Sequence, residues 1–367
     1  MLREDLAIAE CDLLLIMLSL NPVVHSLFLG KRGKGAGFTG LFFFGSFRHV
    51  DNNCILNNII MTFGVKRIVV RQENTLVLRK DAGLFLYDKN KKTFNSLGHS
   101  DSKLLDFTKD GSVAVINGGE LLIKGNANRT SLKFLNTNSN KKIFETTKFW
   151  AFRAITDTTS SKVLVEHSSG LTCLTLNNGE IIFDKKRIEV YLCNSDILVS
   201  KNLVYMPSNK KSLRLFDFNN LTLDEIKIKT RGKTENLKIL NDENKILISD
   251  SANIMYCYSL DNFEKPDWII DFSKFDKPFS RVWCYNIYRI DKELACVQSF
   301  LPNENQHNYA GGKLWIFNPL TGVIVDSYDY SNFNQEIASE YGKTSILLDD
   351  LREFDLIKKT ITKSEFT

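Results

Sequence analysis

The chain has 367 residues, of which 43% are hydrophobic and 25% charged, and this balance excludes an intrinsically disordered protein. The length is sufficient to bury one large repeat domain or two ordinary domains. The formal net charge is +5 and the isoelectric point is about 8.6, but the lysines are interleaved with Asp and Glu along the chain. Because no basic segment stands apart, a nucleic-acid partner is not expected.

The N-terminal part differs from the rest of the chain. Residues 13–18 form an uncharged apolar run that resumes after Pro22 and is barely long enough to cross a bilayer. Acidic residues outnumber basic ones before it, which is the reverse of a secretory signal peptide. Three interpretations stay open: a membrane anchor, a loosely attached helix and tail, or a stretch upstream of the true start.

We therefore predict two parts. Residues 1–60 form an N-terminal extension, either poorly structured or a weak apolar helix, and the folded domain covers residues 61–367, starting at Met61. Any membrane association is expected only through residues 13–29.

From Val65 onward the chain is a series of short strands. Residues rich in Val, Ile, Phe and Tyr alternate with polar ones and are bounded by Gly, Asn, Asp and Ser, whereas few windows favour a helical period. Residues 97–135 show the pattern, with a Lys-Asp-Gly turn, a run at residues 113–116, a Gly-Gly turn and a run at residues 121–123. We predict three strands in an antiparallel meander here.

Similar hairpins recur about every 40 to 45 residues, which is the period of a four-stranded propeller blade. They begin near residues 83, 171, 212, 254 and 312. One blade cannot cover both of its faces, whereas blades stacked around an axis bury both. We predict an all-β fold, a β-propeller of seven four-stranded blades, with six as the alternative. First strands are expected near residues 65, 102, 151, 188, 235, 281 and 337, and the strand at 65–70 is a candidate to complete the short last blade.

Two places resemble a known repeat. Gly98-His99, followed by Asp110-Gly111-Ser112, resembles the opening half of a WD40 repeat. Residues 313–322, KLWIFNPLTG, resemble the closing half of a WD40 or quinoprotein-like repeat. At the level of repeat shape the likeness covers residues 61–367 and implies a WD40-like or quinoprotein-like β-propeller, although the chain has no Trp-Asp dipeptide. Such a fold hosts unrelated functions.

The sequence offers no recognisable catalytic or metal site. The five histidines form no His-x-x-x-His or His-Glu-x-x-His pair, and no Gly-x-Ser-x-Gly elbow is present. The glycine-rich residues 30–37 lack the spacing of a phosphate loop. His99 is expected to make structural hydrogen bonds, and His167 is expected to end a strand. We predict no enzyme activity, no metal and no cofactor.

The cysteine pattern indicates a reducing compartment. Seven cysteines are present and no CxxC motif occurs. Four of them lie in apolar alternations and are expected to be buried, reduced thiols: Cys173, Cys193, Cys257 and Cys296. This usage favours a cytoplasmic location.

Large aromatic residues gather in the later repeats, mostly at positions expected between blades. Loops at one end of a propeller are natural docking surfaces, and Trp, Tyr and Arg contribute most of the energy at interfaces. The insertion at residues 301–311 is long for a hairpin loop and is expected to project from one face. We predict a binding rim composed of Arg281, Trp283, Tyr285, His307 and Tyr309.

These patterns together predict a non-catalytic propeller that binds another protein as a scaffold, adaptor or neutralising partner. The sequence does not identify that partner. The alternative is a propeller enzyme or cofactor binder of quinoprotein-like or lyase-like type, with its site in the central channel. That alternative requires polar residues at repeat-equivalent loop positions, and the aligned hairpins lack one.

Overall fold

The computed structural model describes residues 65–70, 74–79, 83–88, 91–99, 102–118, 131–148, 151–188, 195–208, 210–274, 283–302, 309–329, 337–341, 344–348 and 351–364. All of them belong to one compact unit, Asn52–Thr367. The predicted extension over residues 1–60 and the predicted start at Met61 lie outside the described residues.

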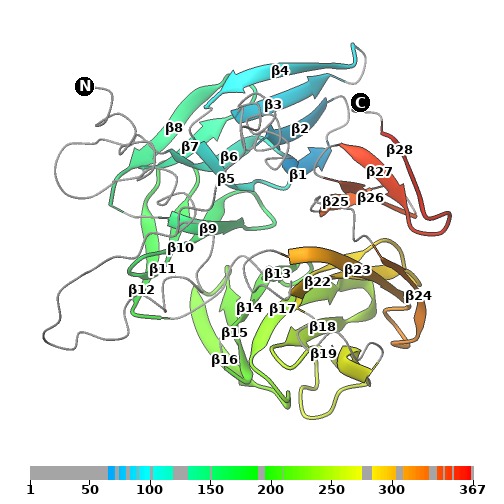
Figure 1. Cartoon of the computed structure of the whole chain (residues 1–367). Helices are drawn as coiled ribbons and strands as arrows, with labels where there is room; N and C mark the ends of the chain where they lie inside the picture. The colour runs from blue at the N-terminus through cyan, green and yellow to red at the C-terminus, as the bar shows by residue number, and fades with distance from the viewer. Residues whose placement is uncertain are drawn as a thin grey trace, which may run out of the picture. The chain divides into compact units, whose positions relative to one another are not determined.

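The strands form seven sheets of four, each an antiparallel meander in chain order (Figure 1). The first three sheets contain β1 (Val65–Val70), β2 (Asn74–Arg79), β3 (Gly83–Asp88), β4 (Thr93–Gly98), β5 (Ser102–Phe107), β6 (Val113–Gly118), β7 (Ser131–Asn136), β8 (Lys141–Thr146), β9 (Ala151–Thr156), β10 (Lys162–His167), β11 (Gly170–Thr175) and β12 (Ile181–Lys186). The next two contain β13 (Asp196–Leu198), β14 (Leu203–Pro207), β15 (Ser212–Asp217), β16 (Thr222–Lys227), β17 (Thr234–Leu240), β18 (Lys245–Asp250), β19 (Ile254–Ser259) and β20 (Trp268–Asp271), with short 3-10 helices η2 (Asn241–Glu243) and η3 (Phe272–Lys274). The last two contain β21 (Trp283–Arg289), β22 (Ala295–Pro302), β23 (Tyr309–Phe317), β24 (Ile324–Asp329), β25 (Ile337–Tyr341), β26 (Ser345–Leu348), β27 (Arg352–Asp355) and β28 (Thr360–Lys363).

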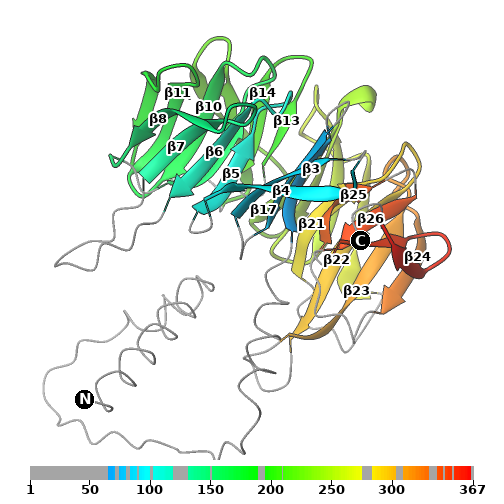
Figure 2. The same cartoon turned by 90° about the horizontal axis from the view of Figure 1, so that it is seen from above.

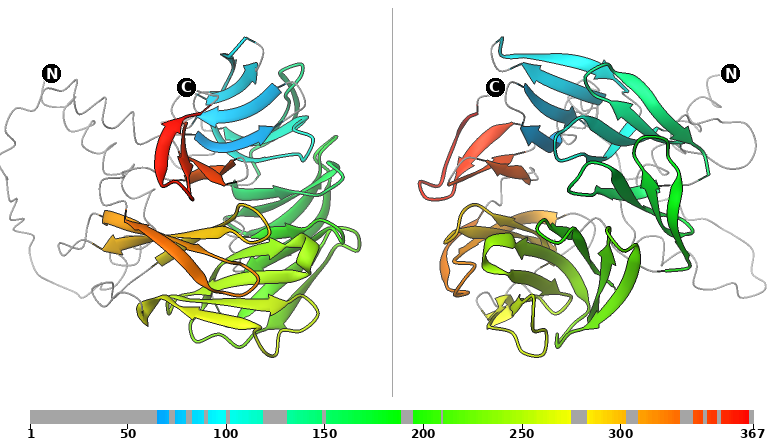
Figure 3. Two further views of the ribbon diagram at one scale, coloured as in Figure 1. Left: turned by 90° about the vertical axis from the view of Figure 1, so that its right-hand side faces the viewer. Right: turned by 180° about the vertical axis from the view of Figure 1, so that it is seen from behind.

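The hydrophobic core is distributed between neighbouring sheets. Each of the six clusters found among the described residues joins two successive sheets. Leu84 of the first sheet packs with Phe107 of the second, for example, and Cys296 of the sixth packs with Phe354 of the seventh. The first strands β1 and β25 also contact each other, so the last sheet lies beside the first (Figures 2 and 3). The fold is therefore a seven-bladed β-propeller, as predicted.

Burial follows from this stacking. The second and third strands of a blade are covered on both faces, so β18 and β19 are buried along nearly their whole length. The fourth strands form the outer edges, and in β4 and β16 two of the six residues are half-buried and the other four are exposed. The middle strands are therefore continuous apolar runs, whereas the outer strands are mostly polar.

The ring closes without exchange of a strand. The strand Val65–Val70 pairs with β2 in the first blade, and the seventh blade is completed by β25 to β28 from the C-terminal part of the chain. The prediction that residues 65–70 complete the last blade is therefore wrong. The physical reason is that the short stretch after Ile337 already supplies four strands, although three of them have only four residues.

Three further predictions need correction. The third strand of the second blade is β7, whose Ser131 pairs with Gly118, and the run at residues 121–123 lies outside the described residues. The first strand of the fourth blade begins at Asp196 rather than near residue 188. In the sixth blade the hairpin strands extend into the predicted loop, because Pro302 pairs with Tyr309.

The turn between the third and fourth strands repeats around the propeller. In six blades a residue with positive φ follows four positions after the start of the turn: Lys92, Asn140, Gly179, Leu221, Gly322 and Lys359, with φ from 51° to 71°. In four of these turns the opening side chain accepts backbone N–H groups two and three residues later: Asn136, Asp217, Asn318 and Asp355. This Asx turn is the physical unit behind the repeat.

The same turn also contacts the preceding blade. Asn140 Nδ2 donates to Leu97 O at 2.8 Å, and Lys359 forms an ion pair with Asp326. A Cβ at Gly322 would lie 2.6 Å from the Trp268 ring, and one at Gly179 would lie 2.2 Å from Phe144. The turn therefore joins successive blades at their outer edges.

Three of the four cysteines expected to be buried are buried, free thiols: Cys173, Cys257 and Cys296. Burial raises the pKa of Cys173 and of Cys257 to about 12, so these thiols stay protonated and unreactive in the folded protein. Cys193 lies outside the described residues.

Candidate binding surface

The meander in each blade places successive turns on alternate ends of the propeller. One end carries the hairpins between second and third strands and the connections from one blade to the next. The other end carries the turns between first and second strands and between third and fourth strands. We call these two ends the hairpin end and the turn end.

In blades 3 to 5 the hairpin end is strongly basic. Exposed cationic side chains come from the end of β12, the β14–β15 hairpin, the end of β16 and the connection from blade 4 to blade 5. They are Lys185, Lys186, Arg187, Lys210, Lys211, Lys227, Arg231 and Lys233, and we call this set the basic rim. No ion pair joins any of them to another residue that the structure describes. Phe152, which is 40% exposed, lies at the same end.

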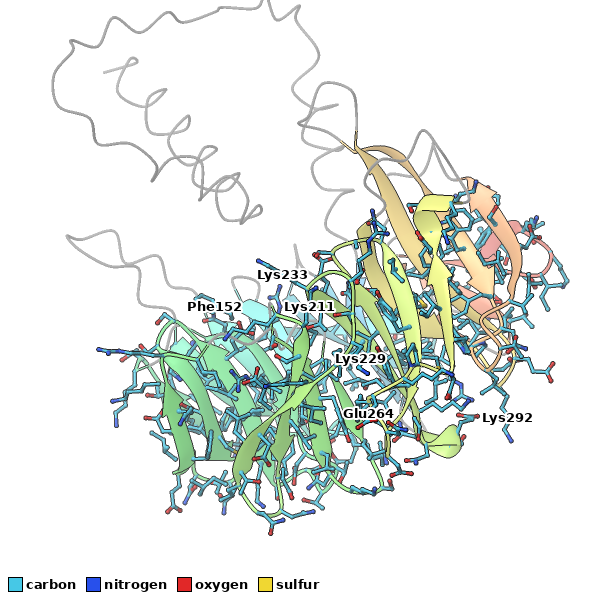
Figure 4. All side chains as sticks on the ribbon, turned by 90° about the horizontal axis from the view of Figure 1, so that it is seen from below. Phe152, Lys211, Lys229, Lys233, Glu264 and Lys292 are labelled. Atoms are coloured by element: carbon cyan, nitrogen blue, oxygen red, sulfur yellow. The ribbon has the colours of Figure 1, made fainter. Side chains whose placement is uncertain are left out.

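The turn end of the same blades is acidic. Its exposed carboxylates are Glu180, Asp242, Asp261, Glu264 and Asp267, against exposed Lys201 and Lys265. Figure 4 shows Phe152, Lys211 and Lys233 along one side of the blades and Glu264 on the opposite side. The propeller therefore has an electrostatic polarity from one end to the other.

This polarity arises although lysines are interleaved with Asp and Glu along the sequence. Basic and acidic turns alternate along the chain, as in Lys210-Lys211, then Asp217, then Lys227 to Lys233, then Asp242-Glu243. Because successive turns fall on opposite ends, charges that are interleaved in the sequence become segregated in space. The basic rim can therefore be recognised only when the blade topology assigns each turn to one end of the propeller.

The loops that carry the rim are tied to one another. Thr234 N donates to Lys210 O at 2.9 Å, and Ile228 N donates to Lys211 O at 3.2 Å. On the other side, Lys233 N donates to Ser251 Oγ and Ser251 N donates to Lys233 O, at 2.9 and 2.8 Å. The connection between blades 4 and 5 is thus fixed to a hairpin on each side.

Asp250 organises the blade 5 side of this junction. It is buried and ends β18. Its Oδ2 accepts from Gly232 N at 2.6 Å and from the Tyr256 hydroxyl at 3.0 Å, and its Oδ1 accepts from Ala252 N and Ile254 N. The Tyr256 hydroxyl in turn accepts from Arg231 N at 2.9 Å, and burial raises the pKa of Tyr256. Asp250 therefore holds the backbone that carries the adjoining rim residues.

The predicted binding rim of blade 6 is described only in part. Arg281 and His307 lie outside the described residues. Trp283 and Tyr285 are in β21, and Tyr309 begins β23 instead of lying in the predicted loop at residues 301–311. Trp283 pairs with Phe300, which pairs with Gly312, so Trp283 and Tyr309 share the hairpin end of this blade. That end also carries the basic rim.

In blade 3 a hydrogen-bonded chain links buried His167 and Thr172 to exposed Asp184. It has the residue types of a catalytic triad, but its hydrogen bonds run in the opposite direction. His167 ends β10, as predicted. Its Nε2 is 2.8 Å from Thr172 Oγ1, which donates to Asp184 Oδ1 at 2.9 Å, and its Nδ1 accepts from Ser169 N at 3.2 Å. An activated nucleophile donates its proton to the histidine, whereas this threonine donates to the carboxylate. The chain of bonds is therefore structural and fixes a neutral imidazole that carries its proton on Nε2.

The described part of the chain contains no group of three or more His, Cys, Asp or Glu side chains that could hold a metal ion. Among the same residues no helix has both the length and the apolar character needed to cross a membrane.

The comparisons with known proteins bear on the fold. No family model matches the chain, and no curated protein matches it. Many solved structures do match. One of them is KlHsv2 with loop 6CD replaced by a Gly-Ser linker, with a TM-score of 0.53 and 9% sequence identity over 80% of this chain and 93% of that chain. At this identity the likeness shows the fold alone.

Proposed function

We propose that this propeller is a non-catalytic scaffold that binds another protein at its hairpin end. The observation that carries the proposal is the concentration of exposed cations on that end of blades 3 to 5, which form no ion pair with the residues that the structure describes, opposite an acidic turn end. Segregated charge of this kind steers a complementary partner and selects its orientation.

A protein partner fits the rim better than a nucleic acid does. Sequence-specific recognition of bases relies on bidentate side chains such as arginine, whereas most of the rim residues are lysines, which act as point charges. Single-stranded nucleic acid binding also uses several exposed aromatic platforms. In the described residues of blades 3 to 5, Phe152 is the one exposed aromatic side chain.

The test is affinity capture with the full-length protein in extracts of its native host. We expect a specific partner that is recovered with wild type and with the control Lys265→Glu/Lys292→Glu, and that is lost with Lys185→Glu/Lys186→Glu. Both variants change the charge equally, one at the turn end and one at the rim. Equal recovery with all three proteins would overturn the proposed location of the surface.

A second variant tests the part of the surface predicted in blade 6. Arg281→Ala/Tyr309→Ala removes two residues of the predicted rim composed of Arg281, Trp283, Tyr285, His307 and Tyr309. We expect weaker recovery of the same partner. Metal and cofactor analysis of the purified protein accompanies the capture, and a retained redox cofactor or metal ion would contradict the non-catalytic assignment.

A further inference from the structure

We infer that the junction between blades 4 and 5 anchors an acidic peptide segment of the partner, a run of Asp and Glu side chains, through Lys210, Lys211, Arg231 and Lys233. This inference rests on the proposed function and names the chemistry of its ligand. The four side chains are exposed and come from two loops that cross at the hairpin end.

The crossing brings the four cations together. The bond from Thr234 N to Lys210 O makes Lys210 a neighbour of Lys233, since Lys233 immediately precedes Thr234. Lys211 is held next to the start of the same connection by Ile228 N. Figure 4 shows Lys211 and Lys233 close to one another at this end, with Lys229 lower on the side of the blades.

The carboxylates nearest the junction are already engaged. Both oxygens of Asp250 accept hydrogen bonds. Glu225 pairs with Arg214 at 2.9 Å and accepts from Ser212 Oγ at 2.7 Å. Glu235, two residues after Lys233, is half-buried and interacts with the charge of Lys233. Four cations against this one further carboxylate leave a local excess of positive charge, and a ligand carrying several negative charges complements it.

The backbone at the junction disfavours a compact phosphate group. Phosphate sites commonly offer several free backbone N–H groups that point at the anion. Here the N–H groups of Arg231, Gly232, Lys233 and Thr234 all donate within the protein. Long lysine side chains on a fixed loop remain, and these suit carboxylates that are spaced along an extended peptide.

The experiment measures binding of a fluorescein-labelled oligoglutamate peptide to the full-length protein by fluorescence anisotropy. We expect binding that weakens with added salt, and a dissociation constant raised about tenfold or more by Lys211→Glu/Lys233→Glu, equivalent to about 1.4 kcal/mol. The control Lys265→Glu/Lys292→Glu carries the same charge change at the turn end and should bind as wild type. Circular dichroism and thermal unfolding verify that both variants are folded.

Three results would overturn the inference: no binding of the peptide, equal weakening by both double variants, or preferential binding of an oligothymidylate of equal charge that depends on Lys211 and Lys233. A fourth such result would be displacement of the labelled peptide by inorganic pyrophosphate at a lower concentration of charge than unlabelled oligoglutamate requires, because it would point to a phosphate ligand. The capture experiment with Lys185→Glu/Lys186→Glu is separate, so loss of the peptide result leaves the scaffold proposal to be judged by its own test.

Discussion

His167 shows how one buried side chain can make the fold sensitive to acid. Its two ring nitrogens are committed, Nε2 to Thr172 and Nδ1 to the Ser169 N–H. Protonation of Nδ1 would turn this acceptor into a donor, and it would then face the Ser169 N–H, which is also a donor. Burial lowers the pKa of His167 below its ordinary value of 6.5, and the charge of Asp184 opposes this shift only in part. The neutral form is therefore the one that the fold requires.

We predict that stability falls as the pH drops through about 6.5, because the unfolded chain binds a proton there before the folded chain does. His167→Gln keeps a donor for Thr172 but cannot titrate, so its unfolding free energy should decline less between neutral pH and about pH 5. Urea unfolding at a series of pH values measures both slopes. Parallel slopes for the two proteins would show that another group is responsible.

Glycine is required at one strand position by direct contact. Gly170 begins β11 with φ 147°, and a Cβ there would lie 2.1 Å from Lys185 O in the neighbouring strand. Gly98 also has positive φ, but a Cβ there meets nothing within 4 Å. Gly170→Ala should therefore destabilise the fold by more than the roughly 1–2 kcal/mol of backbone strain expected for Gly98→Ala. Equal losses in denaturant unfolding would refute the contact argument.

At the scale of elements, the turn from third to fourth strand carries strain that can be relieved. Lys92 and Leu221 occupy its left-handed position with φ of 51° and 54°. Lys92 is exposed, whereas Leu221 packs against the cluster between blades 3 and 4. Lys92→Gly should stabilise the protein by about 0.5–1 kcal/mol, since glycine adopts this conformation freely. Leu221→Gly should destabilise it through lost burial, and thermal unfolding of the two variants should show shifts of opposite sign.

The strand order could be predicted from the sequence because the buried middle strands of each blade are recognisable as apolar runs. Six of the seven predicted first strands lie within two residues of the observed ones, from Val65 to Ile337. The exception precedes Asp196, where Ile188 is apolar and half-buried against the cluster between blades 3 and 4 although it follows the strand β12. Alternation reports burial, and it does not distinguish a strand from a packed connection.

The basic rim was harder to predict because its residues are far apart in the sequence. The predicted rim of blade 6 relies on residues that lie close together in the sequence, such as Trp283 and Tyr285, whereas the basic rim is distributed over segments from Lys185 to Lys233. Its members come together only when each turn is assigned to an end of the propeller. The left-handed turn signature was missed for a related reason, because Lys, Leu, Asn and Gly all occupy it.

At the scale of the whole molecule, the closure between blades 1 and 7 is the place where the ring should open first. The first strands β1 and β25 meet there. As at every other junction no strand pairs across it, but here the chain does not run directly from one blade to the next. Three of the four strands of the seventh blade also have only four residues. We expect faster amide hydrogen exchange in blades 1 and 7 than in β18 and β19. Uniform protection around the ring would indicate that packing alone makes this junction as strong as the others.

The absence of a shared strand has a consequence for how such a chain can change over generations. Every module is encoded by one uninterrupted stretch, so duplication or deletion of about 45 codons in phase with the repeat would leave every remaining hydrogen-bonded ladder whole. Only the angle between neighbouring modules would need to adjust. A propeller in which one blade combines strands from both ends of the chain lacks this freedom at that blade, because such a blade cannot be duplicated as one continuous stretch.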